Sequence, residues 1–289
     1  MSDGRTIDAT TQVCAVWGNP VEHSLSPAIH NAAFAECQLN YVYVGFRVED
    51  VAAATAGFRA LHNFRGLSVT IPHKVAIMPH LDRIDDIARH IGSVNTVVKE
   101  ESGTLRGTST DGPAAVKALR DRGADPADRH VLILGSGGAA RAVAFALAML
   151  PDPPRLTILG VVGEEVRRLA VDLRDRTAAA VQGAILTGES LAAAIATAEI
   201  LVHCTPVGMA PHVDATLVPC ELLRSGLAVF DIVYTPRRTR LLREAAAAGC
   251  LTIEGLDMFV NQAAAQFELW TGCPAPVPVM RRVVKERLR

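Results

Sequence analysis

Several features that mark other classes of protein are missing from this sequence. No run approaches the roughly 18 consecutive apolar residues of a membrane-spanning helix. The 29 lysines and arginines are balanced by 30 aspartates and glutamates, and no basic block predicts nucleic-acid binding. The first twelve residues, MSDGRTIDATTQ, are polar and lack the apolar core of a secretion signal. We therefore expect a soluble cytoplasmic protein that binds neither membranes nor nucleic acids.

Paired cysteines are also missing. The six cysteines are scattered along the chain and form no CxxC pair, so the sequence indicates neither a zinc site nor a disulfide framework. We expect no metal, and thiols that stay reduced as they do in a cytoplasm.

What is present is the composition of a well-packed globular chain. Its 289 residues are 49% hydrophobic and 20% charged, which is enough for two domains with separate cores. The first part alternates short β-type and helical runs, which predicts βα units around a mostly parallel sheet. We expect strands at 13–17, 41–46, 67–71 and 94–98, and helices at 27–37, 51–61 and 81–90.

The alternation begins again near residue 111. A helix at about 112–122 leads to HVLIL (130–134), an unbroken apolar strand of the kind that is buried on both faces. Further strands are expected at 155–159, 181–186, 199–204 and 227–234, with helices between them, including an Ala-rich one at 187–198. This pattern predicts a Rossmann-like, doubly wound nucleotide-binding domain. A helical tail runs from 255 to 289.

A glycine-rich turn directly follows HVLIL. Residues 135–140 read GSGGAA and fit GxGxxA through Gly135, Gly137 and Ala140. The first glycine permits a tight turn, the second lets the backbone approach a pyrophosphate, and the small third residue lets the helix pack on the strand. A plain turn without a ligand is the alternative, but the strand–loop–helix context favours dinucleotide binding.

The choice between NAD and NADP depends on the end of the next strand. An acid there suits the NAD ribose, and basic groups suit the NADP phosphate. Gly160-Val161-Val162 carries neither, while Glu164 and Glu165 follow, and then Arg167 and Arg168. We favour NAD slightly, because two acids near the site repel a 2′-phosphate.

Several polar residues of the first part are not needed to build the fold. Lys74 follows a strand and a proline, at the edge of the sheet where α/β proteins place ligands. Asn95 interrupts an apolar run, and Asp111 lies at the domain junction. Each also has an ordinary explanation: solvated surface for Lys74, a turn for Asn95 and a helix cap for Asp111. Ser26 is expected to be a helix N-cap, whereas Ser24 has no such role.

Eight segments occur in an order that resembles the shikimate dehydrogenase family, which includes quinate/shikimate dehydrogenases. They are HSLSPAIHNAAF, GLSVTIPHK, GSVNTVV, GTSTDG, GSGGAARA, CTPVGM, DIVYTPRRT and GLDMFVNQAAAQFELWTG, and they cover essentially the whole chain. The resemblance implies reversible reduction of 3-dehydroshikimate to shikimate, or the quinate equivalent, with NAD or NADP. It places that reaction in the chorismate pathway of aromatic amino-acid biosynthesis, with a cyclic hydroxy acid as substrate in a monomer or homodimer.

The resemblance also implies an α/β fold of two domains and a role for each matching residue. The N-terminal substrate-binding domain is expected at 1–110 plus 256–289, and the dinucleotide-binding domain at 111–255. Lys74 and Asp111 become the catalytic pair. Substrate ligands are Ser24, Ser26, Thr70, Asn95, Tyr234 and Gln262. Cofactor-binding residues are Gly135, Ser136, Gly137, Gly138, Ala139, Ile232 and Gly255.

The chain departs from the family pattern near these residues. Ser68, Ser109 and His203 stand where the family usually has Asn, Asp257 where it has Gly, and Gly160-Val161-Val162 where NADP-preferring members have Asn-Arg-Thr. These departures leave two alternatives open: a non-catalytic dinucleotide or metabolite sensor on the same fold, and a dehydrogenase for an amino- or deoxy-shikimate analogue.

Overall fold

The computed structural model describes residues 7–288. Residues 1–6 and 289, which fall inside the expected polar N-terminus and at the end of the expected helical tail, lie outside the described part. Contacts divide the chain into unit 1, within residues 1–110 and 260–287, and unit 2, residues 111–259. Unit 2 ends at Phe259, whereas the dinucleotide-binding domain is expected to end at 255.

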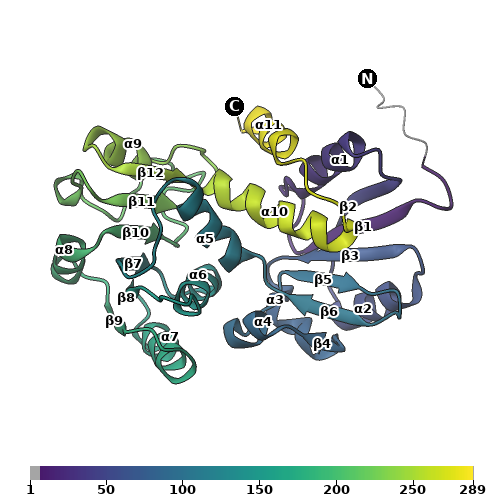
Figure 1. Cartoon of the computed structure of the whole chain (residues 1–289), viewed down its shortest axis with the longest axis horizontal. Coiled ribbons are helices and arrows are strands. Elements are labelled where there is room, and N and C mark those ends of the chain that lie inside the picture. Colours follow the sequence, from purple (N-terminus) through teal and green to yellow (C-terminus); the bar gives the residue numbers. More distant parts are fainter. Residues whose placement is uncertain (1–6, 289) are drawn as a thin grey trace. The chain divides into compact units, whose positions relative to one another are not determined.

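Unit 1 is built on one mixed sheet. Its strand order is β2-β1-β3-β5-β6-β4, with β5 antiparallel to both of its neighbours and the other pairs parallel (Figure 1). Its elements are β1 (Gln12–Gly18), α1 (Ser26–Glu36), β2 (Tyr41–Arg47), α2 (Val51–Ala60), β3 (Phe64–Val69), α3 (His73–Ala76), the 3₁₀ helix η1 (Met78–His80), β4 (Arg83–Ile84), α4 (Asp86–Ile91), β5 (Thr96–Lys99), β6 (Leu105–Thr108) and α11 (Val277–Arg287).

Unit 2 is a parallel sheet with the strand order β12-β11-β10-β7-β8-β9. Its elements are α5 (Asp111–Asp121), β7 (His130–Leu134), α6 (Gly138–Ala148), β8 (Arg155–Gly160), α7 (Gly163–Arg176), β9 (Val181–Ile185), α8 (Gly188–Thr197), β10 (Ile200–His203), the 3₁₀ helix η2 (Cys220–Leu222), β11 (Ala228–Asp231), α9 (Arg240–Ala247) and β12 (Leu251–Glu254). Helix α10 (Gly255–Thr271) begins in unit 2 and continues in unit 1. The predicted α/β fold class is confirmed.

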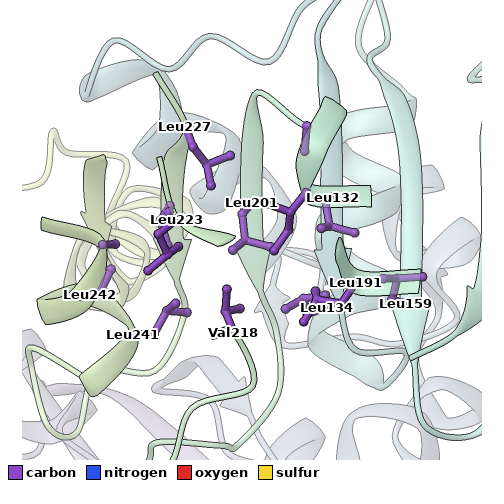
Figure 2. Packing of buried hydrophobic residues seen from close by; sticks show 14 residues of the cluster. Leu132, Leu134, Leu159, Leu191, Leu201, Val218, Leu223, Leu227, Leu241 and Leu242 are labelled. Carbon is purple, nitrogen blue, oxygen red and sulfur yellow. The ribbon is translucent and has the colours of Figure 1, made fainter. Parts of the chain in front are cut away.

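The apolar run HVLIL forms a strand that is buried on both faces of the second sheet. Every residue of β7 is buried. Successive side chains of a strand point to opposite faces, and only Leu132 and Leu134 belong to the core cluster of Figure 2. The same cluster contains Leu191 of α8 and, on its far side, Leu241 and Leu242 of α9. A strand covered on both faces has no need of polar alternation, which is why its sequence is continuously apolar.

Two local predictions are wrong. The helix expected at 81–90 is strand β4 followed by α4, because Arg83 and Ile84 pair with β6 and Asp85 donates its backbone N–H to the Gly107 carbonyl. Ser26 is not the N-cap of α1: it is the first helical residue, and Leu25 precedes it without a side-chain cap. Strands β6 and β12 and helices α3 and α9 were not expected.

Candidate active site

Two of the predicted substrate residues of unit 1, Thr70 and Asn95, lie where β3 ends. Because β5 runs antiparallel to β3 and β6, its amino end adjoins their carboxyl ends, with Thr96 in register with Ser68 and with Thr108. Just before β5, the carbonyl of Asn95 accepts the N–H of Val69 at 2.7 Å. Thr70 follows Val69 directly. The carboxyl edge of β3 therefore brings Thr70 and Asn95 together.

Lys74 lies on the same edge through its backbone. Its carbonyl accepts the N–H of Val94, the residue before Asn95, at 2.8 Å. The loop that leads to it is fixed on two sides: His73 donates its N–H to the Thr70 carbonyl at 2.9 Å, and the buried His73 ring contacts the Val48 carbonyl at 2.8 Å. The Lys74 side chain is half-buried. The prediction that Lys74 lies just beyond the end of a strand agrees with this geometry, and the closeness of Asn95 is added by the structure.

A series of buried hydrogen bonds connects Asn95, at this edge, to residues of β2, β3, β5 and α10. The Tyr43 hydroxyl donates to Ser68 Oγ at 2.6 Å, and Ser68 donates to Gln266 Oε1 at 2.9 Å. Gln266 Nε2 donates to Thr96 Oγ1 at 2.9 Å, and Thr96 donates to Asn95 Oδ1 at 2.7 Å. Each polar group is satisfied by a neighbour, so the network costs little desolvation and fixes the Asn95 amide in one orientation.

Asn95 in turn fixes the backbone next to Asp111. Its Oδ1 accepts the N–H of Thr110 at 2.9 Å, and its Nδ2 donates to Thr110 Oγ1 at 3.0 Å. Asp111 is the next residue along the chain and lies in the first turn of α5, where the helix dipole favours a carboxylate. Asn95 therefore does more than form a turn, which was its ordinary explanation: its side chain holds Thr110 in place.

Ser24 and Ser26 exchange their expected local roles. Ser26 lies buried in the first turn of α1, and Ser24 Oγ accepts the Ser26 N–H at 3.3 Å. The serine expected to have no structural role is the one that binds the backbone at the helix start. Gln262, the remaining substrate candidate of this unit, is half-buried on α10.

His30 was missed by sequence reasoning. Its ring is fully buried and stacks on Tyr43 with a centroid distance of 4.5 Å, with Trp270 at 5.1 Å. Burial among these rings lowers the pKa of His30 to about 3, so the imidazole is neutral near pH 7. Its only signal in the sequence is its place on the apolar face of α1.

The glycine turn of unit 2 leaves its backbone open beside a helix start, as the predicted pyrophosphate site requires. Gly135 adopts φ +116°, and a Cβ there would lie 2.8 Å from the Cys204 carbonyl oxygen. Helix α6 begins without a side-chain cap, and a Cβ on Gly137 or Gly138 would meet nothing within 4 Å. Open backbone at an uncapped helix start suits an anionic ligand. Ser136 and Ala139 are the other predicted residues of this turn. The turn as a whole fits the pyrophosphate of a dinucleotide.

Two further predicted cofactor residues lie together in unit 2. Ile232 donates its N–H to the His203 carbonyl at 3.1 Å, and Gly255 packs so closely on the Ile232 carbonyl that any side chain would collide with it. Nearby in the chain, the Tyr234 ring stacks on Phe259 at 5.0 Å. Burial raises the pKa of Tyr234, which keeps its hydroxyl protonated at neutral pH.

A buried histidine–aspartate pair joins the ends of β10 and β11. His203 Nδ1 lies 2.9 Å from Asp231 Oδ1, and the Thr205 hydroxyl lies 2.5 Å from His203 Nε2. Thr239 donates to the other Asp231 oxygen at 2.6 Å. Both members of the pair are at most 2% exposed. The pair holds residues 203–205 against Gly135, whose Cβ position is bounded by Cys204 and Thr205.

Comparison with known proteins identifies the family of this chain. Residues 16–97 match the family described as "Shikimate dehydrogenase substrate binding domain", and residues 255–285 match "Shikimate 5'-dehydrogenase C-terminal domain". The chain is 44% identical to the shikimate dehydrogenase (NADP(+)) of Moorella thermoacetica, over 98% of this chain and 95% of that protein. The chain belongs to the shikimate dehydrogenase family.

Two other members show how completely the family fold is shared. The shikimate dehydrogenase (NADP(+)) of Methanopyrus kandleri is 44% identical over the full length of both chains. The crystal structure of Listeria monocytogenes shikimate 5-dehydrogenase with shikimate and NAD has a TM-score of 0.92 at 35% identity, covering 97% of this chain and 98% of that one. The predicted class, an NAD(P)-dependent oxidoreductase of the shikimate dehydrogenase family, is confirmed.

Three departures from the family pattern have structural partners here. Ser68 links Tyr43 to Gln266, and His203 pairs with Asp231. Asp257 is 3% exposed, and its Oδ2 forms an ion pair with Arg122 Nη2 at 2.9 Å. Nothing in the structure explains Ser109. Of the altered positions that motivate the sensor alternative, 68, 109 and 160–162, Ser68 is the one built into this buried network.

Residues 7–288 contain no helix that is both long and apolar enough to cross a membrane. Within the same range, no group of three or more His, Cys, Asp or Glu side chains is placed to hold a metal ion.

Proposed function

We propose that this chain reversibly oxidises shikimate to 3-dehydroshikimate, or quinate to its ketone, with NAD or NADP. Lys74 and Asp111 form the proton-transfer pair in this proposal. The observation that carries it is the shared edge of β3 and β5. There the Lys74 carbonyl accepts the N–H of Val94, the residue before Asn95, and Asn95 Oδ1 accepts the N–H of Thr110, the residue before Asp111. Family membership supplies the reaction class.

The bound dinucleotide would take or give the hydride at the ring carbon that carries the hydroxyl. The protein must then handle the other hydrogen of that alcohol. During oxidation Lys74 Nζ takes the hydroxyl proton, and during reduction it returns the proton to the carbonyl oxygen. Its ammonium form also stabilises negative charge that develops on that oxygen. Asp111 would orient the Lys74 Nζ and share a hydrogen bond with the same hydroxyl.

The remaining predicted residues position the two ligands. Hydroxyls and amides recognise a polyol acid, and a site that hydrogen-bonds each hydroxyl rejects analogues lacking one. We assign this role to Ser24, Ser26, Thr70, Asn95, Tyr234 and Gln262. Dinucleotide binding falls to Gly135, Ser136, Gly137, Gly138, Ala139, Ile232 and Gly255. The open backbone at Gly137 and Gly138 supports the second assignment.

The natural setting of this activity is proposed to be the cytoplasm, with the chain working as a monomer or homodimer. All six cysteines are free thiols in the structure, and burial raises the pKa of Cys14 and Cys204 well above its ordinary range. Thiols of this kind are unreactive and fit a reducing compartment.

Steady-state kinetics of Lys74→Ala test the proposal. The wild type should form reduced dinucleotide from shikimate or quinate, and Lys74→Ala should lower kcat by about 10²–10⁴-fold, the usual contribution of a positioned acid–base group. Lys117→Ala is the matched control: this exposed lysine pairs with Asp121 on α5, and its loss should leave kcat unchanged. Intact folding of each variant is checked by circular dichroism.

Two outcomes would contradict the assignment. A folded Lys74→Ala protein that keeps more than about a tenth of wild-type turnover would remove Lys74 from the chemistry. A wild type that binds dinucleotides yet turns over neither shikimate, quinate nor their amino and deoxy analogues would contradict catalysis and favour a sensor.

A further inference from the structure

The end of strand β8 lies against the glycine turn. Strands β7 and β8 pair in parallel up to Leu134 and Leu159, so their carboxyl ends are neighbours. A Cβ on Gly160 would come within 3.0 Å of Ser136 Oγ. In a dinucleotide-binding fold this is the place where the ribose of the adenosine half lies. The tip itself, Val161 and Val162, is exposed and uncharged.

One carboxylate is fixed at this tip. Glu165 lies in the first turn of α7, and its Oε2 accepts a hydrogen bond from Ser136 Oγ at 2.9 Å. The bond crosses from α7 to the glycine turn, so it places a negative charge beside the predicted phosphate cradle. Glu165 is otherwise exposed, which leaves its second carboxylate oxygen within reach of solvent or a ligand.

Two of the three neighbouring arginines pair with other carboxylates, and the third is exposed. Arg167 pairs with Glu164 at 2.6 Å, and this guanidinium lowers the pKa of Glu164. Arg141 pairs with Asp172 at 2.7 Å. Arg168 is exposed on α7, three residues beyond Glu165. Among these charged side chains, the one that hydrogen-bonds to the glycine turn is Glu165.

We propose that Glu165 makes this chain select NAD over NADP, an inference that rests on dinucleotide binding at the glycine turn as proposed above. A carboxylate accepts a hydrogen bond from the ribose 2′-hydroxyl of NAD, whereas it repels the 2′-phosphate of NADP. The chain would then differ in cofactor preference from the relatives whose names carry NADP(+). The uncharged tip at Val161 offers the 2′-phosphate no compensating cation.

The test is calorimetric binding of NAD⁺ and NADP⁺ to the full-length protein without substrate, so turnover does not enter the measurement. The wild type should bind NAD⁺ at least about tenfold more tightly than NADP⁺. A difference of this size is expected when a carboxylate faces a doubly charged phosphate near a solvated surface. Glu165→Gln should bind NADP⁺ about tenfold more tightly than the wild type does and NAD⁺ a few-fold less tightly. Glu189→Gln, an exposed acid in the first turn of α8, is the matched control and should leave both affinities unchanged.

Three results would overturn the proposal. One is a wild type that binds NADP⁺ as tightly as NAD⁺. Another is a Glu165→Gln protein whose ratio of affinities equals that of the wild type. The third is strong NADP⁺ binding that disappears in Arg168→Ala, because Arg168 would then be the residue that reads the 2′-phosphate. A chain that binds neither dinucleotide would contradict the proposed function as well, whereas a chain that prefers NAD⁺ but lacks shikimate turnover would contradict only the proposed function.

Discussion

Lowering the pH should destabilise unit 1 through a single buried histidine. His30 is fully buried against Tyr43 and Trp270, and this burial lowers its pKa from 6.5 to about 3. In the unfolded chain the imidazole regains an ordinary pKa near 6.5. Between these two values the unfolded state binds a proton that the folded state does not. The free energy of unfolding therefore decreases as the pH falls below about 6.5.

The magnitude follows from the width of that window. Each pH unit below the unfolded pKa costs about 1.4 kcal/mol until the folded pKa is reached. At pH 5, about one and a half units into the window, His30 should have removed about 2 kcal/mol of the stability present at pH 8. This stability is fully present above the unfolded pKa and is lost on acidification.

Urea unfolding followed by tryptophan fluorescence measures this effect. The chain has two tryptophans, Trp17 and Trp270, and both belong to unit 1, so the signal reports the unit that contains His30. His30→Phe is the matched variant, because it keeps an aromatic ring against Tyr43 and Trp270 and removes the titrating group. The difference in unfolding free energy between pH 8 and pH 5 should be about 2 kcal/mol larger in the wild type than in His30→Phe.

Other groups that titrate in this range contribute equally to the unfolding free energies of both proteins, so their contributions cancel in the comparison. If wild type and His30→Phe lose equal stability between pH 8 and pH 5, then His30 is either solvated or protonated in the folded protein, and the argument from burial is refuted. A wild type that gains stability on acidification would show that His30 has an anionic partner.

Two other substitutions test the site geometry. Gly137→Ala should weaken dinucleotide binding about tenfold in calorimetry, because a pyrophosphate needs a close approach to the backbone. It should not lower the Tm, because the φ of −74° and the open space at this position accept alanine. An unchanged affinity would show that the pyrophosphate does not bind at Gly137. Gln266→Leu should cost about 2–3 kcal/mol in urea unfolding, because the buried Ser68 and Thr96 hydroxyls lose a partner; a loss below about 0.5 kcal/mol would mean that the buried hydrogen bonds are dispensable.

Local sequence was sufficient where one short segment contains all the information. The glycine turn is such a case: Gly135 needs a positive φ, and Gly137 must leave space, so both requirements are written into consecutive residues. The unbroken apolar run of β7 likewise predicted a strand buried on both faces. Local sequence failed at 81–90, where the pairing of Arg83 and Ile84 with β6 overrides the helical pattern.

At the carboxyl end of β3, local sequence predicted part of the site and the tertiary structure decided the rest. Sequence placed Lys74 after a strand and marked Asn95 as an interruption, but each residue also had an ordinary local explanation. Only the antiparallel insertion of β5 next to β3 joins Val94 to the Lys74 carbonyl and Asn95 to Val69. Strand direction is decided by the packing of the whole sheet, so no window of sequence around Lys74 contains it.

The sequence by itself determined the alternation of strands and helices, the family and the candidate residues, because periodicity and ordered motifs are properties of the chain. Tertiary structure decided which of those residues are satisfied by one another. It joined Tyr43, Ser68 and Gln266 into one buried network, made His30 a neutral ring and bound Glu165 to Ser136. Hydrogen bonds and desolvation act between side chains distant in sequence, and they exist only once the chain has folded.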